Sequence, residues 1–277
     1  MEDEINELSG ILVEMHPNEP RALILRGELL LMSEKFEEAL DLFKKVNTLD
    51  PGKYQVWENI LRINAYLENY SQLAQESSTA IDLFPVQPMP YYFNGIAHYL
   101  LKNYEKAIQS LTTGVKFIVN NNALSSDFYS MIGDNWHALE KDNESFAAYE
   151  SALKFNPDNA SVLNNYAYYL SIQGKDLEKA AKMAKRANEL SPDNATFLDT
   201  YAWVFFKQGN YNQALIYIEK ALQLNEKSGG VEYEHYGDIL FRLNRISDAI
   251  IWWKKAQETG EGSTLLESKI KDGKLYE

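Results

Sequence analysis

The sequence predicts an all-α protein assembled from one repeated pair of helices. The first observation is a proline period, because Pro17, Pro51 and Pro85 are 34 residues apart and Pro157 and Pro192 are 35 apart. Each proline follows an apolar amphipathic stretch. A proline just past a helix end stops the helix, since it lacks an amide donor and clashes with the preceding turn. A period of this length is typical of helical repeat architectures.

The second observation is that small residues keep the same period at two positions. The first position holds Gly27, Gly95, Gly133, Ala167, Ala202 and Gly237. The second, twelve or thirteen residues later, holds Ala39, Ala107, Ala180, Ala214 and Ala249. Two antiparallel helices that pack closely need a small residue on each at the crossing point. A large side chain follows the second position at helical spacing, as Phe43, Leu111, Ile218 and Trp253.

Together these positions resemble the tetratricopeptide repeat. The best match lies between residues 198 and 221, at Leu198, Tyr201, Ala202, Phe205, Gly209, Tyr211, Ala214, Ile218 and Ala221. The resemblance implies a right-handed superhelical solenoid of helix-turn-helix units. It also implies that the first helix of each unit lines a concave groove and the second lies outside.

The repeat phase predicts one solenoid domain over residues 1–277. A partial repeat spans residues 3–17, and we expect the natural chain to continue before it, since its first helix is missing. Seven repeats follow, at about residues 20–53, 54–87, 88–122, 126–159, 160–194, 195–229 and 230–260. Extra residues around 120–122 and 228–230 predict longer loops. Residues 263–272 predict a capping helix whose polar outer face carries Glu267, Lys269 and Lys271.

Charge and composition exclude several classes of function. Forty acidic against 27 basic residues give a net charge of −13, which disfavours binding to nucleic acid or to anionic membrane surfaces. No cysteine is present, so disulfides, thiolate nucleophiles and cysteine metal sites are excluded. No apolar run is long enough for a membrane-spanning helix, and the acidic N-terminus is unlike a signal peptide.

The C-terminal half resembles tetratricopeptide proteins and lipoproteins of the bacterial cell envelope. The stretches that carry this resemblance are residues 164–168 and 236–240 together with Trp252, Trp253 and the capping helix. It implies a periplasmic or outer-membrane-associated protein whose N-terminal signal has been removed. A complete chain would instead be cytoplasmic.

Positions 2, 5, 9 and 12 of each unit are expected to face the groove. Large aromatic side chains at such positions are typical of binding hot spots. Carboxylates lie between them, which favours a peptide or protein partner with apolar and basic residues. The alternative is that the curvature of the solenoid buries some of these rings against the next repeat. The predicted groove residues are Tyr92, Tyr99, Asp127, Asp134, Asn164, Tyr168, Asp199, Trp203, Phe206, Glu234 and Asp238.

No motif for catalysis is recognisable. The four histidines do not lie at metal-ligand spacing, and neither a phosphate-binding loop nor a nucleophile elbow is present. We therefore predict a non-catalytic interaction scaffold without catalytic residues, metal or cofactor. Two alternatives stay open. One is a glycan-binding module that uses the groove aromatics, and the other is a structural element that self-assembles through its exposed end helix.

Overall fold

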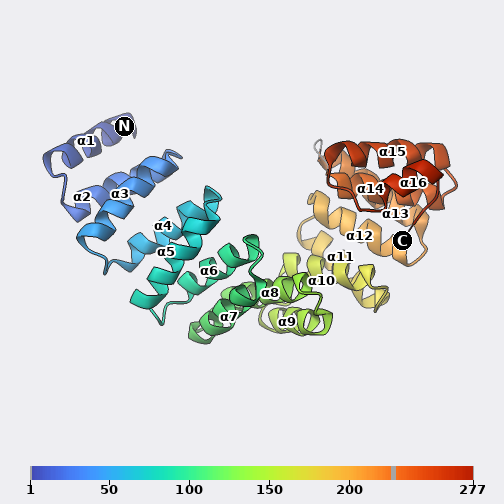
Figure 1. Cartoon of the computed structure of the whole chain (residues 1–277), viewed down its shortest axis with the longest axis horizontal. Coiled ribbons are helices and arrows are strands. Elements are labelled where there is room, and N and C mark those ends of the chain that lie inside the picture. The colour runs from blue at the N-terminus through green and yellow to red at the C-terminus, as the bar shows by residue number, and fades with distance from the viewer. Residues whose placement is uncertain (1, 226–228, 277) are drawn as a thin grey trace. The chain divides into compact units, whose positions relative to one another are not determined.

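The computed structural model describes residues 2–225 and 229–276, with side chains from residue 5 onward. Every regular element in this part is helical, and the sixteen α-helices confirm the predicted all-α class (Figure 1). Contacts divide the chain into two compact units, residues 1–155 and 156–277. Each unit is described by itself, and one continuous domain over the whole chain stays a prediction. No helix in the described part is both long and apolar enough to cross a membrane.

The first unit contains nine α-helices among its described residues. They are α1 (Glu2–Met15), α2 (Pro20–Met32), α3 (Phe36–Leu49), α4 (Tyr54–Tyr66), α5 (Tyr70–Leu83), α6 (Pro88–Leu100), α7 (Tyr104–Gly114), α8 (Asn122–Ala138) and α9 (Asp142–Phe155). A short 3-10 helix, η1 (Val115–Phe117), follows α7. From α2 onward the helices pack as consecutive pairs, and each pair also packs on the next.

The second unit repeats this arrangement with three pairs and a cap. Its described helices are α10 (Ala160–Ile172), α11 (Leu177–Leu190), α12 (Ala195–Lys207), α13 (Tyr211–Leu224), α14 (Gly230–Arg242), α15 (Ile246–Thr259) and α16 (Leu266–Asp272). First helices of neighbouring pairs also contact one another, as α4 and α6 do in the first unit and α10 and α12 do in the second.

The same tight turn joins the two helices of every pair. The amide of Lys35 donates to the carbonyl of Leu30 at 2.9 Å, and Glu34 between them has a left-handed φ of 57°. This is the hydrogen bond of a Schellman helix end, which satisfies a carbonyl that the helix itself leaves free. The bond recurs from Asn69 to Asn64, Asn103 to His98, Lys141 to Trp136, Lys175 to Leu170, Asn210 to Phe205 and Arg245 to Leu240.

The small residues lie where the paired helices cross. A Cβ added at Gly27 would come within 2.8 Å of the Phe43 ring, and one added at Gly237 within 2.4 Å of the Trp253 ring. Phe43 and Trp253 are completely buried. A glycine on one helix therefore makes room for a large ring on the other, which sets how closely the two helices approach.

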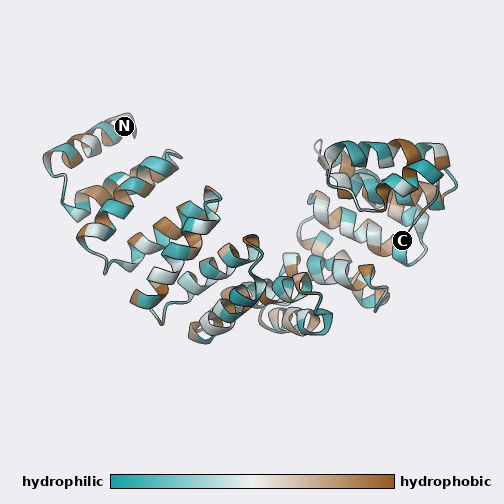
Figure 2. Ribbon diagram, in the orientation of Figure 1, coloured by the Kyte–Doolittle hydropathy of each residue, from teal (hydrophilic) through white to brown (hydrophobic). Residues whose placement is uncertain are grey.

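Helix α1 presents an apolar stripe to solvent in the first unit, and Figure 2 shows both polar and apolar residues along it. Its other face packs on α2, where Arg26 donates to Asn6 and Ser9. The exposed apolar side chains are Ile5, Leu8, Ile11, Leu12 and Met15.

One predicted boundary differs from the structure. The fourth repeat was expected to begin at residue 126 after a longer loop, but α8 begins at Asn122. The reason is a cap: the Asn121 side chain accepts a hydrogen bond from the amide of Leu124 and satisfies one free amide of the first turn. Of the second predicted loop, residues 226–228 lie outside the described residues, and α14 begins at Gly230, where the seventh repeat was predicted to begin.

Candidate functional site

A pocket of about 390 Å³ lies in the second unit where its three first helices meet the C-terminal segment. Four of the predicted groove residues line it, namely Tyr168, Trp203, Glu234 and Asp238. Further lining residues are Ile172 and Lys207 from α10 and α12, Val231 and His235 from α14, and Glu261, Gly262, Ser263, Leu265, Lys269 and Tyr276 from the C-terminal segment.

The aromatic wall of this pocket is mostly part of the core. The Trp203 ring stacks on His235 with centroids 4.0 Å apart and on Phe206 with centroids 4.7 Å apart. Trp203 and Phe206 are only 8% and 3% exposed. These two rings are therefore buried, as the alternative prediction held, and are not exposed in an open groove. Tyr168 stays half-buried. Burial, and then the charges of Asp199 and Glu234, raise the pKa of its hydroxyl to about 12.

The floor of the pocket is a buried ion cluster centred on Lys269. Its Nζ lies 2.7 Å from Glu234 Oε1 and 2.7 Å from Asp238 Oδ2. Both the amide and the hydroxyl of Ser263 donate to Glu234, and Trp253 Nε1 donates to Asp238 at 2.8 Å. The two carboxylates predicted to meet a basic partner are therefore already bound by a lysine of the same chain.

This arrangement corrects the prediction for the cap. Lys269 was expected on the polar outer face of α16, but it is only 3% exposed. Glu234 and Asp238 lie four residues apart and so share one face of α14, where two buried carboxylates require a cation. The sequence did contain a signal that Lys269 is buried. Lys269 lies beside Ile270 and three residues after Leu266, which places it on the apolar side of the short helix.

The two carboxylates respond differently to this lysine. Burial by itself raises the pKa of Glu234, but hydrogen bonds from Lys269 and Ser263 outweigh it, so the pKa lies below its usual value. Asp238 is buried more deeply, at 2% exposed, and burial raises the pKa of its carboxyl despite the charge of Lys269. Lys269 is thus the main group that keeps Glu234 ionised inside the protein.

A second buried pair adjoins this cluster. Nδ1 of His235 lies 2.9 Å from Oδ1 of Asp199, and both residues are 6% exposed. Burial alone would lower the pKa of His235, but the nearby charge of Asp199 and its hydrogen bond raise it above the usual value. Sequence reasoning placed Asp199 in the groove but did not pair it with His235, which lies 36 residues later.

The His235–Asp199 pair predicts how stability depends on pH. A histidine whose pKa is higher in the folded chain stabilises it fully below about pH 6.5, and this contribution disappears as the pH rises through the folded pKa. We expect the free energy of unfolding of the wild type to fall over that interval by at most about 1.4 kcal/mol per pH unit from this group. Urea unfolding between pH 5.5 and 8.5 measures the slope. In the Asp199→Asn variant the slope should shrink, and an identical slope would contradict the assignment.

The other predicted groove residues are not part of the lining of this pocket. In the first unit, Tyr92 of α6 packs on Phe128 of α8 with centroids 5.0 Å apart. Burial, and then the charges of Asp127 and Asp134, raise the pKa of Tyr92 to about 12. The pKa of Tyr99 is also raised, by burial and then by Asp134.

These four residues of the first unit, Tyr92, Tyr99, Asp127 and Asp134, therefore lie near one another. Asn164 of the second unit is 4% exposed and donates to the side chain of Asn165.

Two family models match the chain. The cytochrome c-type biogenesis protein H TPR domain matches residues 98–229, and the tetratricopeptide repeat matches residues 8–54. The chain belongs to the tetratricopeptide-repeat family. Among curated proteins, this TPR chain is similar to human Protein O-mannosyl-transferase TMTC3, with 25% identity over 177 residues. That match covers 64% of the chain but only 19% of the human protein.

Solved structures confirm the TPR solenoid fold. A tetratricopeptide repeat protein from Parabacteroides merdae is 15% identical with a TM-score of 0.70, covering 92% of this chain and 98% of that one. The APC/C hetero-tetramer Cut9–Hcn1 has a chain that is 19% identical with a TM-score of 0.67, covering 86% of this chain and 46% of that one. Pseudomonas aeruginosa pilF is 18% identical with a TM-score of 0.64. These likenesses concern the fold.

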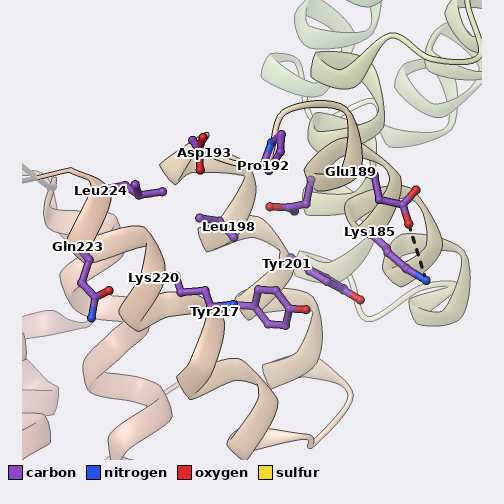
Figure 3. Close-up of a pocket in the computed structure, with 11 residues that line it drawn as sticks. Lys185, Glu189, Pro192, Asp193, Leu198, Tyr201, Tyr217, Lys220, Gln223 and Leu224 are labelled. Carbon is purple, nitrogen blue, oxygen red and sulfur yellow. Dashed lines mark ion pairs between the residues drawn. The ribbon is translucent and has the colours of Figure 1, made fainter.

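A second pocket, of about 470 Å³, lies between α11, α12 and α13 of the TPR array (Figure 3). The Tyr201 and Tyr217 rings lie on its lining with centroids 4.6 Å apart, and Lys185 and Glu189 form an ion pair beside them. The sequence assigned Tyr201 to packing between helices and did not single out this pocket. Among the described residues, no group of three histidine or carboxylate side chains could hold a metal ion.

Proposed function

We propose that this TPR chain is a non-catalytic scaffold that binds a peptide or protein segment along the groove formed by its first helices. The observation that carries the proposal is the pocket of the second unit, where Tyr168, Trp203 and the α14 side chains come from three consecutive repeats. A surface already formed before binding costs the protein little ordering entropy. The name of the human relative states a mannosyl-transferase activity. We do not propose that activity for this chain, because the chain spans only 19% of that protein.

The proposed partner carries apolar anchors and basic residues. Half-buried tyrosines at Tyr92, Tyr99 and Tyr168 offer ring faces to such anchors, and aromatic side chains are common binding hot spots. Burial first, and then neighbouring carboxylates, raise the pKa of Tyr92 and Tyr168, and these carboxylates make the potential at both places favourable to cations. In the second unit Lys269 already neutralises part of this charge, because its ammonium group is bound to both Glu234 and Asp238.

A bacterial cell-envelope location is proposed from resemblance alone. It rests on the similarity of the C-terminal half to envelope TPR proteins and on the family model of cytochrome c-type biogenesis protein H. Fractionation of the source cells with an antibody against this chain would test it, and recovery in the cytoplasmic fraction alone would contradict it.

Replacing Tyr168 with alanine should weaken binding of groove ligands by about tenfold or more, as expected for a hot-spot aromatic. Twelve-residue peptides selected by phage display on the folded chain would supply the ligands, and fluorescence polarisation would measure their affinity. The control is Tyr66→Ala, which removes an exposed tyrosine on α4 of the other unit. Circular dichroism would confirm that both variants are folded.

Three kinds of result would count against the proposal. Equal loss in both variants, or no loss in either, would move the binding site away from the pocket of the second unit. Failure to select any peptide would contradict a scaffold that binds extended segments. Competition by oligosaccharides instead of peptides would favour the glycan-binding alternative.

A further inference from the structure

The pocket of the second unit has a histidine nitrogen without a partner at its base. His235 lines the pocket although it is only 6% exposed. Its Nδ1 is bound to Asp199, which is not itself part of the lining. Nε2 has no hydrogen-bond partner within residues 2–225 and 229–276. Because the two nitrogens point to opposite sides of the ring, Nε2 is the one left for a ligand.

A second ring nitrogen beside it is also unsatisfied. Nε1 of Trp203 is buried and has no hydrogen-bond partner in the described part of the chain. The indole stacks on the His235 ring, with the two planes 17° apart. A buried donor without an acceptor is destabilising, and native proteins keep few of them. This buried donor next to the unbonded Nε2 of His235 indicates that an acceptor is supplied from outside the chain.

The charges around His235 decide what kind of acceptor fits. Asp199 holds Nδ1–H, so Nε2 can donate only when the imidazole is protonated, and Asp199, Asp238 and Glu234 favour that form. The three carboxylates Asp199, Glu234 and Asp238 balance Lys207, Lys269 and the protonated imidazole, so a neutral carbonyl oxygen fits this site without leaving an excess charge. The groups facing the ring are Asp199 and Lys207 from α12, Glu234 and Asp238 from α14, Lys269 from α16 and the Tyr168 ring from α10.

We propose that His235 Nε2–H donates a hydrogen bond to a backbone carbonyl of a peptide bound in this pocket, with Asp199 as the positioning residue. The inference rests on the proposed scaffold function and names the chemistry of one subsite within it. The pocket volume of about 390 Å³ lies within the usual range for ligand pockets, so a short stretch of peptide fits. The half-buried Tyr168 ring lies 6.3 Å from the imidazole and offers a face for the neighbouring side chain.

The test compares three chains with the same selected twelve-residue peptides. Affinities of the wild type, Asp199→Asn and the double variant Asp199→Asn/His235→Phe are measured by isothermal titration at pH 5.5, 7.0 and 8.5. The phenyl ring keeps the stacking on Trp203, and the asparagine avoids an unpaired buried charge. His98→Phe is the matched control, because His98 is a half-buried histidine of the other unit.

We expect the double variant to bind about tenfold more weakly than the wild type at pH 5.5, the usual effect of losing a charged hydrogen-bond donor. Wild-type affinity should fall as the pH rises, and in Asp199→Asn the fall should begin at lower pH. Peptides with an amidated C-terminus should bind as well as free acids. The Nε2 resonance of His235 in ¹⁵N-histidine-labelled protein should shift on peptide binding, which provides the readout if the double variant does not fold.

Three outcomes would overturn the inference. Affinity that is equal in all three chains and independent of pH would show that His235 does not contact the peptide, while the scaffold proposal stands. Loss of binding on C-terminal amidation would assign the subsite to a carboxylate instead of a backbone carbonyl. If no peptide is selected at all, the proposed function itself fails.

Discussion

Replacing Lys269 with alanine is expected to lower the free energy of unfolding of the second unit by about 3–5 kcal/mol. The substitution leaves Glu234 and Asp238 buried beside each other without their cation, and an uncompensated buried charge is far more costly than a lost surface pair. It also removes the ion pairs between α16 and α14. Urea unfolding at pH 7, followed by circular dichroism, measures the loss.

Two comparisons separate this effect from a general weakening of the cap. Lys271→Ala removes an exposed lysine from the same helix and should leave stability nearly unchanged. The triple variant Lys269→Met, Glu234→Gln, Asp238→Asn removes the charges together and should recover much of the loss, since replacing all members of a buried ion pair is often neutral. If Lys269→Ala and Lys271→Ala behaved alike, the buried cluster would not stabilise the cap.

Replacing Phe43 with alanine should destabilise the first unit by about 3–5 kcal/mol. Phe43 is completely buried in the core of α2, α3 and α4, together with Leu23, Val46 and Ile60. Its removal leaves a cavity that the surrounding helices can fill only in part. Because each repeat of a solenoid contacts only its neighbours, hydrogen exchange should show the loss of protection in α2 and α3 and little change in the second unit.

The close approach of Gly27 to Phe43 allows a second test, a double-mutant cycle of these two residues. In the wild type, Gly27→Ala places a Cβ 2.8 Å from the ring and should cost about 1–3 kcal/mol. In the Phe43→Ala background the same methyl group enters the cavity and also favours the helix by about 1 kcal/mol, so the change should become neutral or stabilising. Additive effects in this double-mutant cycle would mean that the two residues do not set the packing distance.

The helix pairs could be predicted because their signals are local. A proline after four of the seven pairs, and a small residue facing a large one at helical spacing, can be recognised within a single repeat of 34 or 35 residues. Helix ends depend on nearby residues as well, yet the start of α8 was predicted four residues late, because the effect of a single asparagine cap was not considered.

The groove could be predicted only as a set of positions. Helical spacing places Tyr168 and Trp203 one step away from the core face, but it does not say how far the next repeat covers them. The structure leaves Tyr168 half-buried and buries Trp203 against Phe206 and His235. How much of each ring is covered depends on the angle between neighbouring repeats, which no single repeat specifies.

The sequence by itself therefore determined the repeat, the helical class, the crossing points of the helix pairs and the absence of cysteine chemistry. Only the tertiary structure decided that Lys269 is buried between Glu234 and Asp238, and that His235 is held by Asp199. These partners are 31 to 36 residues apart, about one repeat length. Pairing across such a distance depends on how one repeat stacks on the next, and the periodic pattern within a repeat carries no information about which polar side chains then meet.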